Sequence, residues 1–162
     1  MHLQPDAIKL ALMEKNRQKK AETAWVLLLR SQQVLIDIVE TKLKSAGFPP
    51  LSWYDLLLEL DREPGRGLRQ YEIGERVLLN KHNLSRLIDR LEKQALVQRV
   101  ACNTDGRGNV IKITEKGVHM RKAMWPIYEQ AIQEVIANPL TVKQIDSLTE
   151  IMGALLNRHI DA

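Results

Sequence analysis

The 162-residue chain has a single cysteine, Cys102, and so cannot form an intrachain disulfide bond. A chain without a disulfide framework fits a reducing compartment, and we expect a cytoplasmic protein. Long apolar runs are absent as well, since the longest, Ala24–Leu29, ends at Arg30 and is far too short to cross a bilayer. No charged segment followed by an apolar stretch opens the chain, as a secretory signal would require. We therefore expect a soluble protein with no membrane partner.

Motifs for nucleotide-dependent or hydrolytic chemistry are also missing. The sequence has no Walker-type phosphate loop, no Gly-x-Gly-x-x-Gly turn after a strand and no Gly-x-Ser-x-Gly nucleophile elbow. His82, His119 and His159 are scattered, without a Cys-x-x-Cys or His-x-x-x-His pattern beside them, so no zinc site is predicted. We expect neither an enzyme nor a protein with a metal or another cofactor.

Positive charge is present in modest excess, but it is concentrated in the middle of the chain. The whole sequence has 24 basic and 20 acidic residues. Residues 80–122 alone have ten basic and four acidic side chains, so the remainder of the chain is net acidic by two. Because neutralising phosphates requires local positive charge, this distribution predicts a polyanion-binding surface in the middle segment.

Hydrophobic periodicity predicts a mainly helical N-terminal part. Residues 5–20 are predicted to form a helical lead-in. A long amphipathic helix is expected from Thr23, its predicted N-cap, to the glycine and prolines within residues 47–50. Ser52 is expected to cap a short helix that ends near Leu60, and a turn-rich connector follows.

Two closely spaced helices and a hairpin are predicted next. The helices are expected at about Leu68–Leu78 and Lys81–Ala95, with helix-turn-helix spacing. The periodicity then changes, and Val97–Cys102 and Asn109–Ile113 form strand-like runs separated by turn-forming residues. Two further helices are expected, the first capped by Thr114.

The C-terminal helices also show helical spacing. Pro126 is expected to kink the first of them or to mark a restart. The second follows Pro139, and its apolar stripe continues to His159. The predicted fold is therefore mainly α with a small β-hairpin wing.

The second helix of the pair has one apolar stripe and a polar remainder. Leu84, Leu87, Ile88 and Leu91 fall at i, i+3, i+4 and i+7 and are predicted to be buried. The solvent-facing side contains residue types that bind base edges and phosphates. The candidate DNA contacts are Asn80, Lys81, His82, Asn83, Ser85, Arg86 and Arg90. Ordinary solvated charges would give the same pattern, so these residues alone do not decide the function.

The order of the elements supports a DNA-binding function. In a winged helix, two tightly spaced helices precede a hairpin, and the hairpin here presents Arg107 between two glycines. An arginine at such a tip can enter a narrow minor groove while the helix lies in the major groove. Asn109 and Lys112 are predicted to contact DNA from the same wing.

Two motifs resemble those of MarR-type regulators. Asp105-Gly106-Arg107, followed by Ile113-Thr114-Glu115-Lys116-Gly117, is similar to that family's wing and to the Leu-Thr-x-x-Gly motif after it. Residues 84–93 resemble its recognition helix. The similarity covers residues 51–117 and departs at Ala95, where the family usually has a helix-ending glycine, and at Gly108 in the wing.

The resemblance implies a homodimer that binds a pseudo-palindromic site in double-stranded DNA, more often as a repressor than as an activator. It assigns residues 48–117 to the winged helix-turn-helix, and 1–47 and 118–162 to flanking dimerisation helices. It also implies that Asp105 braces the wing.

Several alternatives stay open. Trp25, Trp53 and Tyr54 are candidate contacts for a small aromatic or phenolic effector, although aromatic core packing is the favoured interpretation of each residue considered alone. Cys102 is interpreted as incidental, with an oxidant-sensing role as the alternative. A winged-helix protein-interaction module without DNA binding is the second alternative, and it would be expected to lose the basic and amide side chains that this helix retains.

Overall fold

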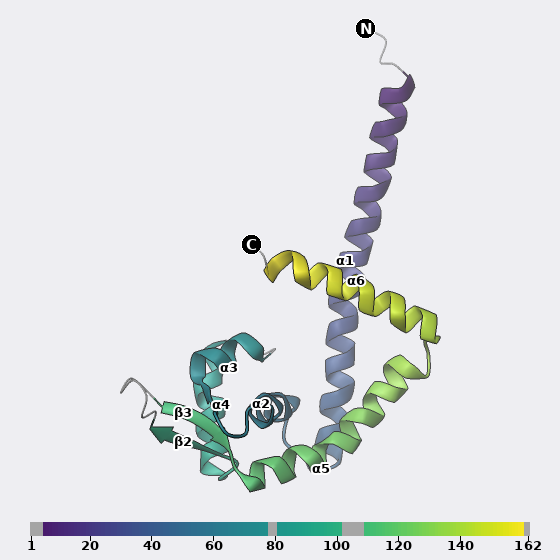
Figure 1. Cartoon of the computed structure of the whole chain (residues 1–162). Helices are drawn as coiled ribbons and strands as arrows, with labels where there is room; N and C mark the ends of the chain where they lie inside the picture. Colours follow the sequence, from purple (N-terminus) through teal and green to yellow (C-terminus); the bar gives the residue numbers. More distant parts are fainter. Residues whose placement is uncertain (1–4, 78–80, 102–108, 161–162) are drawn as a thin grey trace. The chain divides into compact units, whose positions relative to one another are not determined.

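The computed structural model describes residues 5–77, 81–101 and 109–160 (Figure 1). The chain divides into two compact units, residues 1–38 and residues 39–162, and each is described separately. None of the helices in the described ranges has a stretch that is long and apolar enough to cross a membrane.

Helix α1 runs without interruption over Pro5–Ser45 and ends before Gly47, which has a φ of 76°. The expected start of a separate helix at Thr23 is wrong. The Thr23 hydroxyl donates a hydrogen bond to the carbonyl oxygen of Lys19 at 3.0 Å, one turn earlier, and so sits within a continuous helix. In the first unit, the described side chains of α1 are exposed or half-buried.

Helix α2 (Leu51–Asp61) begins after Pro50, so Ser52 lies in its first turn and is not its cap. The first N–H group of α2, that of Leu51, donates to the Glu40 carboxylate at 3.1 Å. This carboxylate satisfies one of the amide groups that a helix leaves free at its N-terminus. A side chain near the end of α1 therefore helps to set where α2 starts.

The sheet has three strands rather than the two of the predicted hairpin. Strands β2 (Val97–Ala101) and β3 (Asn109–Ile113) pair antiparallel, with Val97 opposite Ile113. A short strand β1 (Leu68–Arg69) pairs with the other edge of β3, giving the order β1-β3-β2. The helix predicted from Leu68 therefore begins two residues later, as α3 (Gln70–Arg76).

Helix α4 (Lys81–Lys93) packs beside α3 and β2, and the short helices cluster next to the hairpin (Figure 1). Apolar side chains from α2, α3, α4 and the sheet form one continuous core. Its fully buried members are Leu56, Leu57, Leu60, Leu68, Ile73, Ile88, Leu91, Leu96 and Val97. This core holds α4 against the wing strands.

A second, smaller core joins α2 to the C-terminal part of the chain. It contains Val39, Leu43, Tyr54, Met124 and Ala131. The side chains of α2 therefore divide between two cores, because opposite faces of the helix pack on different partners.

Helix α5 (Glu115–Ile132) contains Pro126 and continues through it, so the expected restart at this proline does not occur. Its hydrogen-bonding pattern changes only later, in a π-helical turn, η1 (Gln133–Ala137). Helix α6 (Val142–Ile160) follows. An ion pair of 2.8 Å between Lys42 and Glu134 joins the end of α1 to η1.

Candidate nucleic-acid interface

Helix α4 has the two-sided character that its sequence predicts. The four aliphatic side chains of its stripe are all buried, from Leu84 to Leu91. Asn83, Ser85, Arg86 and Arg90 are exposed on the other side. Asn80 lies outside the described residues, as do the side chains of Lys81 and His82. Burial of one stripe therefore fixes which face of α4 is available to a partner.

Within the described ranges, the arginines on this exposed face have no competing partner. Arg62, Arg76 and Arg121 in the second unit each form an ion pair with a carboxylate. Arg86 and Arg90 have no ion pair or side-chain hydrogen bond among the described residues. A guanidinium without a carboxylate keeps all its donors available for an anion.

A cleft of about 290 Å³ runs along this face between α4 and the first turn of α2. Both arginines of the exposed face line it, together with Pro50, Ser52, Trp53, Asn83 and Leu87. Sequence reasoning missed the contribution of α2, because nothing in the spacing of residues 50–53 indicates that they pack beside α4. Two cations, an amide and a hydroxyl in one cleft form a surface suited to phosphate oxygens.

Two of the predicted wing contacts, Asn109 and Lys112, lie in the described residues, and they differ in their surroundings. Asn109 is exposed at the end of β3, opposite Ala101. The Lys112 ammonium group donates to the carbonyl oxygen of Gly65 at 2.7 Å and so ties β3 to the connector before β1. Arg107 and Asp105, the predicted groove contact and its brace, lie outside the described residues, as does Cys102.

Sequence reasoning also missed a charged contact between the wing and α4. Arg99 on β2 forms ion pairs with Asp89 and Glu92 on α4. The side-chain hydrogen bond that Arg99 donates to Asp89 and the charge of Glu92 raise the pKa of Arg99 above its ordinary value. No local spacing rule could have found this contact, because the partners belong to different elements.

The turn from the wing into α5 explains the motif at residues 113–117. The Thr114 hydroxyl accepts a hydrogen bond from the Gly117 N–H at 3.1 Å and donates to the carbonyl oxygen of Ala95 at 2.8 Å. It thereby caps α5, as predicted, and holds the end of α4 beside it. Ala95 adopts a φ of 56°, the left-handed conformation in which glycine is most common after a helix.

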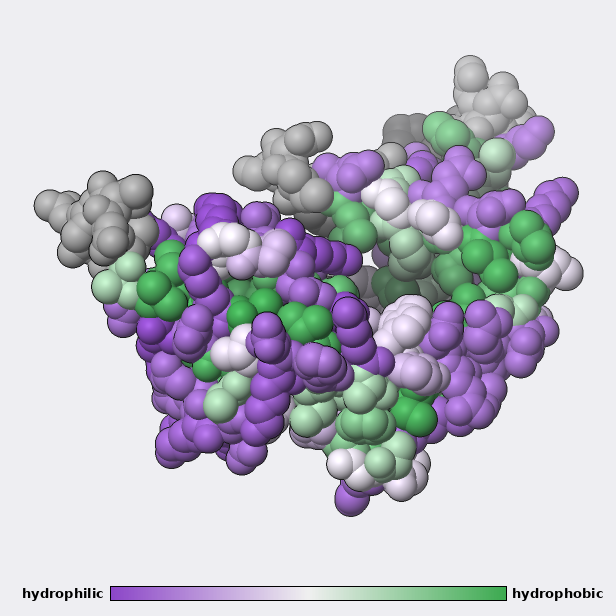
Figure 2. Space-filling model, turned by 60° about the horizontal axis from the view of Figure 1, so that its bottom comes forward, coloured by the Kyte–Doolittle hydropathy of each residue, from purple (hydrophilic) through white to green (hydrophobic). Residues whose placement is uncertain are grey.

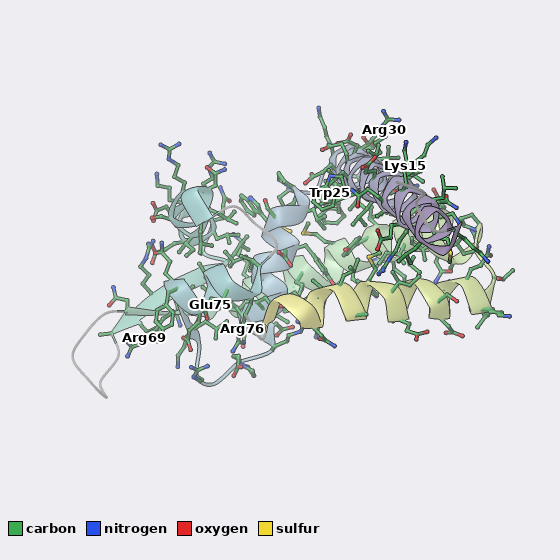
Figure 3. The ribbon with its side chains drawn as sticks, turned by 90° about the horizontal axis from the view of Figure 1, so that it is seen from above. Lys15, Trp25, Arg30, Arg69, Glu75 and Arg76 are labelled. Carbon is green, nitrogen blue, oxygen red and sulfur yellow. The ribbon has the colours of Figure 1, made fainter. Side chains whose placement is uncertain are left out.

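The three aromatic residues of the predicted effector pocket lie in different surroundings. Trp25 projects from α1 in the first unit, where 63% of its surface is exposed (Figure 3). Trp53 packs on the core of the winged helix, whereas Tyr54 is buried in the second core. Consecutive residues of a helix point about 100° apart, so Trp53 and Tyr54 face different partners.

Tyr54 belongs to an aromatic cluster with Trp125 and Tyr128 on α5. The ring centroids of Tyr54 and Tyr128 are 5.1 Å apart in an edge-to-face arrangement, and those of Tyr54 and Trp125 are 6.2 Å apart. Desolvation raises the pKa of both tyrosines, although Arg121 beside Tyr54 opposes the shift there. These contacts support core packing for Tyr54.

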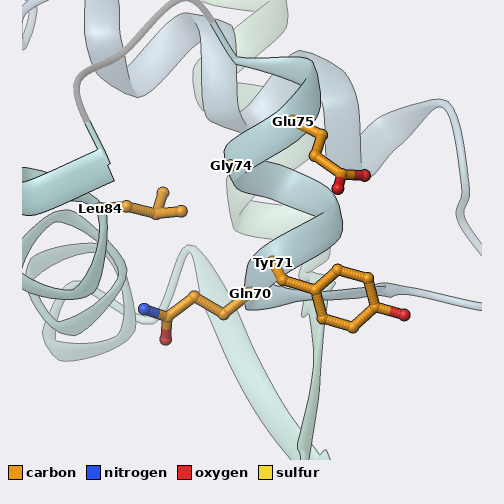
Figure 4. Close-up of a pocket in the computed structure, with 5 residues that line it drawn as sticks. All are labelled: Gln70, Tyr71, Gly74, Glu75 and Leu84. Atoms are coloured by element: carbon orange, nitrogen blue, oxygen red, sulfur yellow. The ribbon is translucent and has the colours of Figure 1, made fainter.

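A separate hollow of about 380 Å³ lies between α3 and α4 (Figure 4). Gln70, Tyr71, Gly74, Glu75 and Leu84 line it, and Tyr71 extends outward from α3. Arg69 precedes the same helix and Arg76 is its last residue (Figure 3). In the parts of the chain that are described, no cluster of three or more histidine, cysteine or acidic side chains is suited to hold a metal ion.

Comparison with known proteins finds a family to which this chain is similar. The sequence model of the MarR family matches residues 46–108, from the end of α1 to the wing. The HTH-type transcriptional regulator MhqR of Bacillus subtilis is 27% identical over 134 residues, which make up 83% of this chain and 90% of that protein.

Solved structures share the fold. The MarR family regulator Sco3205 of Streptomyces coelicolor, solved in complex with DNA, is 28% identical with a TM-score of 0.77, covering 85% of this chain and 86% of that one. AbsC of the same organism is 22% identical with a TM-score of 0.76, covering 87% of this chain and 95% of that one. The chain is therefore similar to the winged helix-turn-helix transcriptional regulators of the MarR family in the sequence of residues 46–108 and in its fold.

Proposed function

We propose that the chain is a transcriptional repressor that binds a pseudo-palindromic site in double-stranded DNA as a homodimer. The observation that carries this proposal is the exposed face of α4, which presents Asn83, Ser85, Arg86 and Arg90. Among the residues that the structure describes, neither guanidinium group has an ion-pair partner. In a winged helix this face enters the major groove, and the two half-sites lie roughly 34–36 Å apart, about one helical turn.

Exposed apolar side chains on the flanking helices support a homodimer. On α6, Val142, Ile151, Leu155 and Leu156 are between 45% and 75% exposed. Figure 2 shows apolar residues at the surface among polar ones on the face that it displays. Monomeric proteins rarely leave extended apolar surface in water, so we propose that a second copy of the chain covers it.

A mobility-shift assay on the DNA that flanks the protein's own gene tests the proposed function. The wild type is expected to shift this DNA, and Arg86→Ala and Arg90→Ala to weaken binding without changing the oligomeric state. Arg62→Ala is a matched control, because its guanidinium is already paired with Glu59 at 2.5 Å. Absence of a shift at low salt would instead favour a protein-interaction module.

Salt titrations would assign the role of each arginine. If Arg86 reads a base edge, its loss is expected to relax specificity at one position by about 1–3 kcal/mol. If it contacts only a phosphate, its loss should weaken binding to all sequences similarly and reduce the salt slope by about one.

We also propose that a small aromatic or phenolic compound releases the DNA. Trp53, which is half-buried and lines the cleft beside α4, is the candidate contact among residues 39–162, whereas Tyr54 is held in the aromatic cluster. Repeating the shift assay with aromatic acids, on the wild type and on Trp53→Ala, tests this. Oxidation of Cys102 is the alternative trigger, and it predicts release by peroxide that Cys102→Ser prevents.

A further inference from the structure

Three charged residues join the wing to α4, and DNA contact does not account for them. We refer to Arg99, Asp89 and Glu92 as the Arg99 cluster. Nη2 of Arg99 lies 2.5 Å from Oδ1 of Asp89, and Nη1 contacts Oε2 of Glu92. The backbone N–H of Arg99 also donates to Oε1 of Glu92 at 3.2 Å. One residue of β2 therefore binds both carboxylates of α4.

These carboxylates lie on a helix that is otherwise suited to bind an anion. Asp89 follows Ser85 by four residues and Arg86 by three, so it shares their side of α4, and its side chain is 51% exposed. Glu92 lies one turn further and is 37% exposed. A free carboxylate at either position would repel the phosphates that the neighbouring arginines attract.

Arg99 is placed to remove this repulsion. Its side chain is less exposed than either partner, at 28%, so both carboxylates approach a guanidinium at the base of the wing. Each terminal nitrogen of the guanidinium donates to one of the two carboxylates, and their negative charges leave this arginine poorly suited to contact a phosphate itself.

We propose that Arg99 is a positioning residue for DNA binding, which holds Asp89 and Glu92 against β2 and neutralises their charge. Helix α4 then presents Arg86 and Arg90 to the phosphates without a competing negative charge beside them. This inference rests on the proposed DNA-binding function, but it makes Arg99 act through two carboxylates and not through the DNA.

The first test is Arg99→Gln, with DNA affinity measured by fluorescence anisotropy. The variant is expected to bind the operator at least about tenfold more weakly at moderate ionic strength, because two carboxylates are released. The deficit should shrink as salt is added, because exposed charges are screened. Arg99→Lys, which keeps the charge, should retain most of the affinity. Arg62→Gln is the control for loss of an ion-paired arginine elsewhere, and it should bind as the wild type does.

The triple variant Arg99→Gln/Asp89→Asn/Glu92→Gln separates masking from direct contact. If Arg99 masks the carboxylates, removing their charge should restore most of the affinity. If Arg99 contacts a phosphate, the triple variant should stay as weak as Arg99→Gln. The double variant Asp89→Asn/Glu92→Gln keeps Arg99 and should bind at least as tightly as the wild type.

Wild-type affinity in Arg99→Gln, no recovery in the triple variant, or weaker binding by the double variant would each overturn the inference. Thermal unfolding of every variant checks that it is folded. If Arg99→Gln fails to fold, the double variant alone decides the question, because it leaves Arg99 in place. Failure of the wild type to bind any DNA would refute the proposed function and would be recognised before any variant is compared.

Discussion

At the start of α5, Gly117 packs against the backbone of the turn that follows α4. A Cβ atom at this position would lie 2.2 Å from the carbonyl oxygen of Leu96 and 2.8 Å from Cγ1 of Ile113. Because backbone atoms cannot yield as a flexible side chain does, Gly117→Ala is expected to destabilise the protein by about 2–3 kcal/mol. Urea unfolding measures this difference. Gly65→Ala, where a Cβ would meet nothing within 4 Å, should change stability little, and equal effects of the two substitutions would contradict the packing explanation.

Ala95 offers the opposite case, a non-glycine residue in the left-handed region. At its φ of 56°, the Cβ atom lies too close to the backbone, which strains the residue. Because Ala95 is exposed, replacing it with glycine removes a methyl group that makes no packing contact in the core. Ala95→Gly is therefore expected to stabilise the protein by roughly 0.5–1 kcal/mol, as the relief of strain exceeds the added entropy of the unfolded chain. Ala123→Gly, at an exposed position within α5, should destabilise by a similar amount. If Ala95→Gly were less stable than the wild type, the explanation by backbone strain at Ala95 would be wrong.

For single residues, the sequence predicted the role of a side chain correctly where that role depends only on residues nearby in the sequence. The buried stripe of α4 and the Thr114 cap are of this kind, since helical spacing and capping chemistry are local. The partners of Arg99 and the separation of Trp53 from Tyr54 were not predictable, because they depend on which elements pack together.

At the scale of the elements, the carboxylate of Glu72 stabilises the start of helix α3. Glu72 accepts a hydrogen bond from the Arg69 N–H at 2.7 Å, and it also contacts the Arg66 guanidinium. The bond from the Arg69 backbone is the main cause that lowers the pKa of Glu72 below its usual value of 4.5. The folded state therefore binds fewer protons here than the unfolded state does, so this stabilisation is present above about pH 4.5 and is lost as the pH falls through the lower folded pKa.

Glu72→Gln is expected to lower the free energy of unfolding by about 1 kcal/mol near neutral pH, and the difference from the wild type should vanish in acid. Urea unfolding at a series of pH values gives both curves. Glu75→Gln is the control, because Glu75 is exposed on the same helix and has no ion pair among the described residues. If the difference in the free energy of unfolding between Glu72→Gln and the wild type stayed the same at low pH, its cause would be the introduced amide and not the lost charge.

The predicted bounds of helices and strands were wrong where contacts with other elements override the preference of the local sequence. Leu68 and Arg69 extend a helical pattern in the sequence, but pairing with Ile111 and Val110 makes them a strand. Thr23 resembles an N-cap, yet its hydroxyl binds a carbonyl of the preceding turn inside α1. The hairpin strands themselves were predicted almost to the residue, because alternation and turn residues specify them locally.

For the whole molecule, the central prediction is that function requires two copies of the chain. Ile151 and Leu155 are one turn apart on α6 and are 56% and 45% exposed. If a second copy buries them, Ile151→Lys/Leu155→Lys should place charges in a desolvated interface and give a monomer. Analytical ultracentrifugation should then find a mass near 18.6 kDa for the variant and twice that value for the wild type. Asn157→Lys, an exposed polar position on the same helix, should stay dimeric.

The monomeric variant should also separate the two contributions to DNA affinity. Each α4 would still reach one half-site, but the second half-site would no longer be bound by a tethered partner, so the gain from effective concentration would disappear. The variant is therefore expected to bind the full palindrome no more tightly than a single half-site, whereas the wild type should prefer the palindrome by about 100-fold or more. Anisotropy titrations on both DNA fragments measure this ratio. A double variant that is monomeric yet retains the preference would show that α6 matters for assembly in solution but not for reading the palindrome.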